Sequence, residues 1–200
     1  PWACEGCGAC IAVCPNHALR FVDVAVGSAC TGTSRVGPMA YGQLGPGEDL
    51  SGRLVTEVRE RAAHAAEQAG ADLVLIDGPP GIGCPVIAAV ANTDLVVGVT
   101  EPTVSGLHDL ERLVGLTTRL GIPVVVVLNK ADLSEPGAES IRAACEEHGL
   151  ELVAEIPYDE VLAETLSAMA AGEAVSADAS VGVTAAREAW DRVAGRVSLG

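Results

Sequence analysis

Basic residues are scarce in this sequence, and lysine is almost absent. The 200 residues include 27 acidic and 12 basic side chains, which gives a formal net charge of -15. Such a charge disfavours a mainly electrostatic grip on nucleic acid or on an anionic membrane. The single lysine, Lys130, stands between Asn129 and Ala131, so the phosphate-binding motif G-x4-G-K-S/T does not occur in these residues. We expect any such loop to lie outside this chain.

Long apolar runs are missing as well. The longest lies near residues 122–128, well short of the roughly 18 to 20 residues of a membrane-spanning helix, and no signal peptide opens the chain. Apolar residues make up 49% of the sequence, which is enough for a sizeable core. We therefore expect a soluble, cytoplasmic protein without a membrane span. Because the sequence begins Pro1-Trp2 without Met, we also expect a fragment or a processed product.

Short apolar runs alternate with longer amphipathic stretches after residue 50. The runs are apolar throughout, as in parallel strands buried on both faces, and they lie at 73–76, 95–99, 124–128 and 152–156. The stretches between them place apolar residues three or four apart, which predicts covering helices. Ser51 is the expected N-cap of the first helix, and the glycines expected to end helices are Gly70, Gly121, Gly149 and Gly172. The pattern predicts an α/β fold with at least four parallel strands and a last helix that carries Trp190.

The first 50 residues have a different pattern. Residues 1–20 are rich in cysteine, and residues 21–26 are consistent with a short strand. Residues 27–48 contain many glycines and little periodicity, which predicts a loop. The sequence therefore predicts a small N-terminal module that an irregular segment joins to the sheet domain.

Four cysteines stand close together at the start of the chain. They have the C-x2-C-x2-C-x3-C-P spacing of bacterial ferredoxin clusters and are Cys4, Cys7, Cys10 and Cys14. Three thiolates at this spacing can bind three corners of one cubane cluster, while Gly6 and Gly8 let backbone N–H groups approach its sulfides. In two-cluster ferredoxins the fourth cysteine binds the other cluster, so Cys14 implies a partner half-motif upstream. The spacing predicts a 4Fe–4S site.

Zinc and inert thiols are the alternatives for these cysteines. A structural zinc site usually brings together two ligand pairs from separated positions, and this cluster leaves no second pair. The remaining cysteines have other roles in this interpretation. Cys145 lies on the apolar stripe of a helix and is expected in the core, and Cys84 opens a helix as a packed small residue. Cys30 lies in the predicted loop, where it could replace a missing ligand.

Polar residues follow the predicted strands at their carboxyl ends, where open α/β sheets bind ligands. Asp77 ends an apolar run, which is the usual position of an acidic residue that holds Mg²⁺ against phosphates. Gly78 and Gly81 belong to a glycine-rich segment that can move with a terminal phosphate. Asn129 and Asp132 offer an amide and a carboxylate suited to the edge of a base. Together these residues predict a nucleotide site.

The stretches 75–86, 100–110 and 129–132 resemble the MinD/Mrp-superfamily P-loop ATPases that carry an inserted ferredoxin domain. The resemblance runs from Cys4 to about Gly172. It implies a P-loop NTPase fold of the SIMIBI/MinD type that lacks its P-loop strand here, together with a partial ferredoxin-like module. The implied domains are the iron–sulfur module at 1–33, the nucleotide-binding domain at 34–175 and a C-terminal helix at 176–200.

The resemblance also implies roles for single residues. Asp77 corresponds to the Walker B-like acid, Asn129 to an adenine contact, and Pro157 to part of the base pocket. The implied cofactors are ATP, Mg²⁺ and a 4Fe–4S cluster. The implied partners are a second copy in an ATP-dependent homodimer and a redox or iron–sulfur acceptor protein.

The leading functional hypothesis is an ATPase whose nucleotide state governs an iron–sulfur module, in cluster delivery or in electron transfer. The alternative is a ferredoxin-like electron carrier whose α/β part is a non-catalytic docking scaffold. A third hypothesis, an ATPase that recruits proteins to a membrane, ranks last. It would be supported by a basic amphipathic C-terminal helix, and residues 184–197 hold only three arginines among acids.

Overall fold

The computed structural model describes residues 6–22, 25, 27–172 and 180–197. Two compact units make up the chain. The first contains residues 1–79 and 83–89, and the second contains residues 80–82 and 90–200. Within the described ranges, no helix has both the length and the apolar character that crossing a membrane requires. Cys4 lies outside the described residues.

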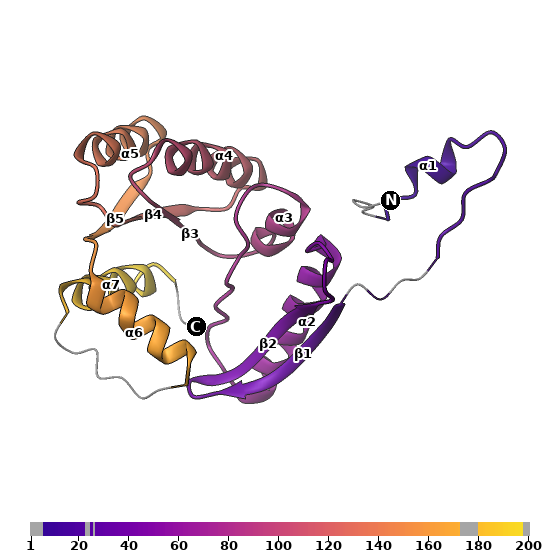
Figure 1. Cartoon of the computed structure of the whole chain (residues 1–200), viewed down its shortest axis with the longest axis horizontal. Coiled ribbons are helices and arrows are strands. Elements are labelled where there is room, and N and C mark those ends of the chain that lie inside the picture. Colours follow the sequence, from indigo (N-terminus) through magenta and orange to yellow (C-terminus); the bar gives the residue numbers. More distant parts are fainter. Residues whose placement is uncertain (1–5, 23–24, 26, 173–179, 198–200) are drawn as a thin grey trace. The chain divides into compact units, whose positions relative to one another are not determined.

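An antiparallel hairpin forms the sheet of the first unit (Figure 1). Strand β1 (Gly27–Ser34) pairs along its whole length with β2 (Gly37–Leu44). The prediction of a loop over 27–48 is therefore wrong. Glycine, serine and threonine dominate β1, so it lacks the apolar alternation that marks a strand, and backbone pairing forms it instead. The strand expected at 21–26 is not formed by Phe21, Val22 or Ala25, the described members of that stretch.

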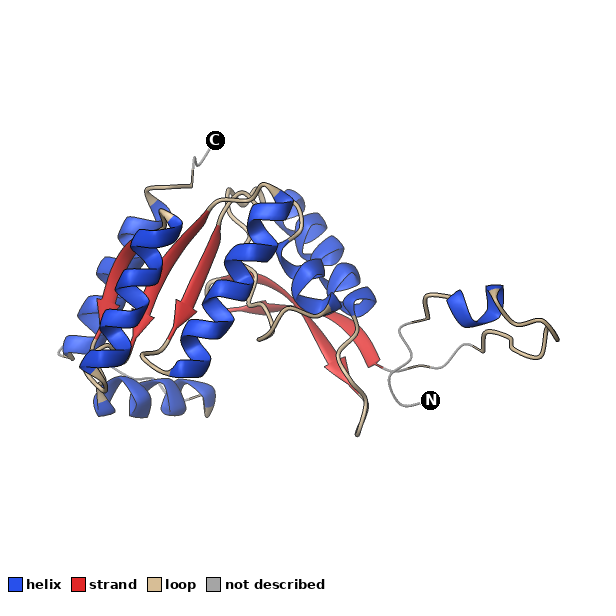
Figure 2. Ribbon diagram, turned by 90° about the horizontal axis from the view of Figure 1, so that it is seen from above, coloured by secondary structure: helices blue, strands red, loops and turns tan. Residues whose placement is uncertain are grey.

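Helix α2 (Gly52–Ala69) packs against this hairpin (Figure 2). Ser51 caps it as predicted, because its Oγ accepts a hydrogen bond from the Leu54 N–H at 3.3 Å. A Cβ atom at Gly42 would come within 3.2 Å of the Leu54 side chain, so this glycine lets the helix lie close to β2. Arg59 of the same helix donates a hydrogen bond to the Ala88 carbonyl at 2.5 Å. The first unit is thus held by one helix that contacts both the hairpin and the segment near residue 88.

Residues 73–76 do not form a strand, so the prediction of a fourth parallel strand is wrong. Leu73, Val74 and Leu75 are 38%, 41% and 77% exposed, and none of the described residues pairs with them in a ladder. An apolar run shows that burial is favourable, but a strand also needs a neighbouring strand to bond its backbone. The two short helices of this part of the chain are α1 (Ala9–Ala12) and α3 (Cys84–Val90). Cys84 opens α3, as predicted, but its thiol is exposed, so the expectation that it is a packed small residue is wrong.

Three parallel strands form the sheet of the second unit. Their order is β3 (Val96–Thr100), β4 (Val124–Asn129) and β5 (Glu151–Ile156). They confirm the other three predicted strands and the α/β class. The helices of this unit are α4 (Val104–Leu120), α5 (Glu135–His148), α6 (Glu160–Ala170) and α7 (Val181–Ala194). Gly121 and Gly149 end α4 and α5 in the left-handed conformation, as predicted, whereas the C-cap of α6 is Ala171 and Gly172 follows it.

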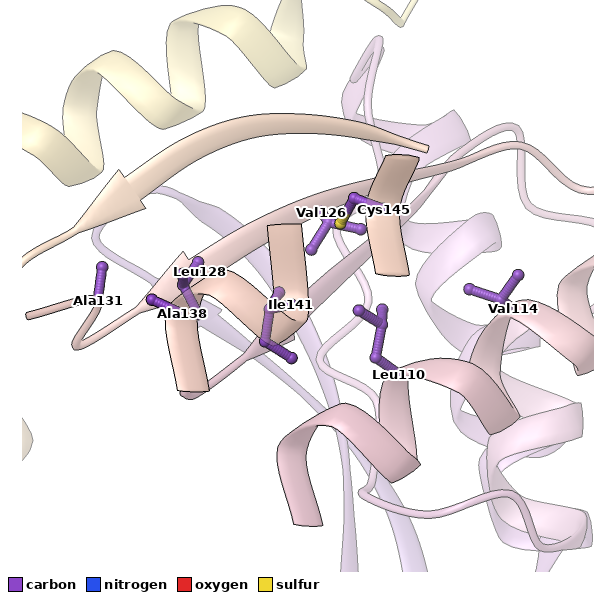
Figure 3. Close-up of a cluster of buried hydrophobic side chains, with 8 residues drawn as sticks. All are labelled: Leu110, Val114, Val126, Leu128, Ala131, Ala138, Ile141 and Cys145. Atoms are coloured by element: carbon purple, nitrogen blue, oxygen red, sulfur yellow. The ribbon is translucent and has the colours of Figure 1, made fainter. Parts of the chain in front are cut away.

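Strand β4 is buried on both faces and builds two cores. Val126 and Leu128, both 0% exposed, lie with side chains of α4 and α5, among them Leu110 and Ile141 (Figure 3). Val125 and Val127 alternate with them and lie in a second cluster with residues of β5 and α7. Cys145 belongs to the first cluster, as predicted, and burial raises the pKa of its thiol. Helices therefore cover both faces of this strand, which explains its unbroken apolar sequence.

The first turn of α5 lies so close to the backbone of Pro102 that only glycine fits at position 137. A Cβ atom at Gly137 would lie 2.1 Å from the Pro102 carbonyl oxygen, although alanine is the better helix former. We expect Gly137→Ala to destabilise the protein by about 2 kcal/mol or more, because the backbone must shift. The control is Gly115→Ala in α4, where nothing lies within 4 Å. That variant should be neutral or more stable by about 0.5–1 kcal/mol in urea unfolding. Equal effects of the two substitutions would contradict the close approach.

Candidate functional site

The carboxyl ends of β3, β4 and β5 meet at one edge of the second unit, as parallel strands must. The turn after β3 is tightly packed, since Thr100 Oγ1 donates to the Gly106 carbonyl at 2.9 Å. A Cβ atom at Gly106 would lie 2.3 Å from the Glu101 carbonyl oxygen. Backbone from the first turn of α4 therefore fixes the position of the Thr100–Pro102 turn.

Lys130 joins the turns after β3 and β4. Its Nζ lies 2.7 Å from Glu101 Oε1, and the two side chains are 38% and 44% exposed. Its backbone has a φ of 54°, a left-handed conformation that is uncommon for residues other than glycine. Such conformations are concentrated at functional sites and tight turns. The ion pair shows that the ammonium group of the single lysine is held by a carboxylate at this edge.

Asp132 connects the turn after β4 to the turn after β5. Its Oδ1 accepts a hydrogen bond from the Tyr158 N–H at 2.6 Å, and the Ala131 N–H donates to the Ile156 carbonyl at 2.9 Å. Asn129 ends β4, half-buried and paired with Ile156. Three predicted site residues, Asn129, Asp132 and Pro157, therefore lie on adjacent turns. One carboxylate oxygen of Asp132 already holds a backbone amide, so it positions the Tyr158 turn whatever else it contacts.

Asp159 is a residue of this edge to which the sequence analysis assigns no role. Its Oδ1 accepts hydrogen bonds from the Val161 and Leu162 N–H groups at 2.8 and 3.2 Å, which caps α6. Its Oδ2 accepts from Ser180 Oγ and from the Gly182 N–H, which hold the start of α7. The hydrogen bond from Ser180, followed by that from Gly182, lowers the pKa of the Asp159 carboxyl. An aspartate just before a helix signals a cap, but the sequence carries no sign of the second helix.

The remaining residues predicted for the nucleotide lie in the stretch of sequence where the chain passes from one unit to the other. Asp77 and Gly78 belong to the first unit, and Gly81 belongs to the second. Asp77 is exposed, and it follows a segment that forms no strand. A Cβ atom at Gly78 would lie 3.7 Å from Ala89, which is ordinary contact. The roles of these three residues stay predictions.

The cysteine segment offers suitable ligands, and those that the structure describes are not gathered into a site. Cys7, Cys10 and Cys14 are all free thiols, and the first two are exposed. A hydrogen bond from the Ala18 N–H, at 3.4 Å from the sulfur, is the main cause that lowers the pKa of Cys14. Among the described residues, no three cysteine, histidine or acidic side chains form a group that could hold a metal ion. The donor chemistry therefore fits an iron–sulfur cluster, whereas the described positions of the thiols do not form its ligand set.

No protein-family profile matches this sequence. An uncharacterized protein of Methanocaldococcus jannaschii is 35% identical over 97 residues, which are 48% of this chain and 34% of that protein. A second uncharacterized protein of the same organism is 29% identical over 132 residues, or 66% of this chain and 46% of the relative. A third, described as an uncharacterized ATP-binding protein, is 27% identical over 90 residues, or 44% and 34%. The chain thus spans a third to a half of the length of the curated relatives that it matches.

Two solved structures share the architecture. One is the cell division ATPase MinD of Pyrococcus furiosus, with a TM-score of 0.57 and 22% identity over 74% of this chain and 60% of that one. The fold is MinD-like. The other is the septum site-determining protein MinD of Pyrococcus horikoshii in complex with Mg-ADP, with a TM-score of 0.55, 25% identity and the same coverage of both chains. The MinD part of the predicted resemblance is thereby confirmed as a fold.

The hydrogen bonds of Asp159 should make stability depend on acid pH. A carboxyl group with a lowered folded pKa stabilises the protein above its unfolded pKa of about 4, and this contribution is lost as the pH falls through the folded value. Glu155 acts in the same direction, since its hydrogen bond with Arg142 lowers its pKa. We expect Asp159→Asn to lower the melting temperature at pH 7 and to flatten its fall below about pH 4. Thermal unfolding at a series of pH values measures this.

The matched control for that experiment is Asp109→Asn. Asp109 is an exposed carboxylate of α4 that makes no hydrogen bond or ion pair within the described part of the chain. This variant should keep the acid dependence of the unmodified protein. If Asp159→Asn behaves like the control at every pH, the carboxylate does not hold the two helices.

Proposed function

We propose that this chain is part of a MinD-type ATPase in which ATP binding and hydrolysis are coupled to an iron–sulfur cluster, for cluster delivery or electron transfer. One observation carries the proposal. A single chain combines the MinD-like fold with a cysteine spacing typical of ferredoxin clusters. Because a fold alone does not establish an activity, nucleotide binding and cluster binding each need support from their own residues.

The nucleotide half is supported by the carboxyl edge of the second unit. Asn129 would contact the base from the end of β4, beside the Pro157 turn that Asp132 holds in place. Asp77 would bind Mg²⁺ through its exposed carboxylate. Lys130 is not a phosphate lysine in this proposal, since it follows β4 directly and pairs with Glu101. Hydrolysis therefore needs a phosphate-binding loop that these 200 residues do not contain.

The cluster half is supported by the type of the ligands. Cys4, Cys7 and Cys10 would bind three corners of a 4Fe–4S cluster, and Cys14 would bind a fourth position or a second cluster. Gly6 and Gly8 have φ values of 66° and 76°, conformations that are easy for glycine and that turn the chain sharply between thiols. When bound, the cluster would supply one-electron chemistry. A homodimer and an acceptor protein remain part of the proposal.

The second candidate is a ferredoxin-like electron carrier with a non-catalytic α/β scaffold. It is favoured because polar groups at the carboxyl edge are already paired with other groups of the protein and not left open for a nucleotide. The Lys130 ammonium is paired with Glu101, and one Asp132 oxygen is bonded to Tyr158. Nucleotide dependence of cluster reduction separates the two candidates.

The cluster half predicts a coloured protein. Expressed without oxygen, the chain should bind iron and sulfide and absorb visible light, because thiolates at this spacing match a cubane. Cys7→Ser should abolish the iron content and the visible band. Cys84→Ser is the matched control, an exposed thiol at the start of α3 outside the motif, and should retain both. Full iron content in Cys7→Ser would overturn the assignment, and zinc in place of iron would favour the structural-zinc alternative.

The nucleotide half predicts that this chain binds Mg-ATP more weakly than a longer parent protein does. The backbone N–H groups and the lysine of a phosphate-binding loop supply most of the contacts to the β and γ phosphates. Without that loop, only the contacts to the base and to Mg²⁺ are left. Mg-ATP titrated into the 200-residue chain should therefore show no saturable binding at micromolar concentration in calorimetry. A parent protein that contains such a loop should bind ATP and hydrolyse it slowly. Tight binding by this chain alone would show that the phosphate site is misplaced.

A further inference from the structure

Helices α6 and α7 of the second unit enclose an apolar groove that the proposed function does not use. The groove has a volume of about 390 Å³ and is lined by Leu162, Val183, Ala186, Arg187, Trp190 and Asp191. Trp190 remains 45% exposed in a chain that has only 2% aromatic residues. On the neighbouring turns of α6, Leu166 is 58% exposed and Met169 is 45% exposed. Exposed apolar side chains that lie next to a groove are a common feature of binding surfaces.

The walls of this groove are fixed before any partner binds. Asp159 holds the first turns of both helices through its two carboxylate oxygens. Further along α7, Arg192 donates to the Val153 carbonyl of β5 at 2.6 Å, and Arg196 forms an ion pair with Glu151. A preformed groove loses little conformational entropy on binding, so its contacts count more fully toward affinity.

The lining residues of α7 form one helical stripe. Val183, Arg187 and Trp190 recur at intervals of three and four residues, with Ala186 and Asp191 beside them. A stripe with this period is complementary to the apolar face of another helix, whose side chains repeat at the same intervals. Tryptophan and arginine are also the residue types most often found at the energetic centre of interfaces.

We propose that this groove binds an amphipathic helix of a partner protein that carries basic residues beside its apolar face. Charge decides among the possible occupants. The chain has a net charge of -15, and the groove lining itself holds one carboxylate, Asp191, and one guanidinium, Arg187. The exposed charged residues of α6 are both acidic, Glu160 and Glu164, and Glu188 is exposed on α7. A second copy of the chain or an anionic membrane would bring like charges together, whereas a basic helix is attracted. This inference does not depend on nucleotide or cluster binding.

A designed peptide tests the groove directly. The probe is a synthetic amphipathic helix of leucine and lysine, and its counterpart replaces every lysine by glutamate. Fluorescence anisotropy with the labelled peptides and the full chain should show one-to-one binding of the lysine peptide and at least tenfold weaker binding of the glutamate peptide. Trp190→Ala should weaken binding of the lysine peptide at least about tenfold. Val104→Ala, which truncates an 89% exposed side chain of α4, is the matched control and should not change it.

A charge reversal keeps the test valid if Trp190→Ala fails to fold. Asp191→Arg changes an exposed side chain at the groove, and it should weaken the lysine peptide and strengthen the glutamate peptide. Binding that responds to neither substitution would be diffuse attraction to an acidic protein and would overturn the proposal. A second result would also overturn the proposal. If light scattering shows a dimer of the chain that Trp190→Ala dissociates, the groove binds a second copy.

Discussion

Burial of β4 on both faces is the constraint on which the second unit depends. Four consecutive valines and a leucine leave the strand no solvent-facing side, so helices must cover both faces of the sheet. Connections that place a helix between parallel strands bring every carboxyl end to one edge. The gathering of the turns that carry Glu101, Asn129 and Asp159 therefore follows from the hydrophobic core, not from attraction among the polar residues themselves.

Backbone contacts make this edge rigid. The carbonyl groups of Glu101 and Pro102 are approached so closely by Gly106 and Gly137 that no side chain fits at either glycine. Asp132 and Asp159 then use their carboxylates on N–H groups of the following turn and of two helices. Polar residues at the ends of strands can thus serve structure and ligand binding together. At Asp132 and Asp159 the structural use is directly visible, while the proposed base contact at this edge is assigned to Asn129.

The cysteine segment and the α6–α7 groove differ in what the sequence reveals about them. The cysteine spacing predicts cluster chemistry, yet the described thiols are not gathered around a common point. The α6–α7 groove is the reverse case. Its residues have no recognisable motif, and only the packing of two helices brings Leu162 beside Trp190.

Local patterns were sufficient for much of this protein. Buried strands, helix stripes, the cap at Ser51 and the core position of Cys145 could all be predicted, since hydrophobic period and capping depend on neighbours in sequence. The strand at 73–76 was predicted wrongly and the β1–β2 hairpin was missed, because strand formation depends on a pairing partner that composition does not reveal. The tertiary structure alone decided the double role of Asp159, the Lys130–Glu101 ion pair and the groove. Each of these joins residues from separate elements, and their proximity arises only when the helices pack against the sheet.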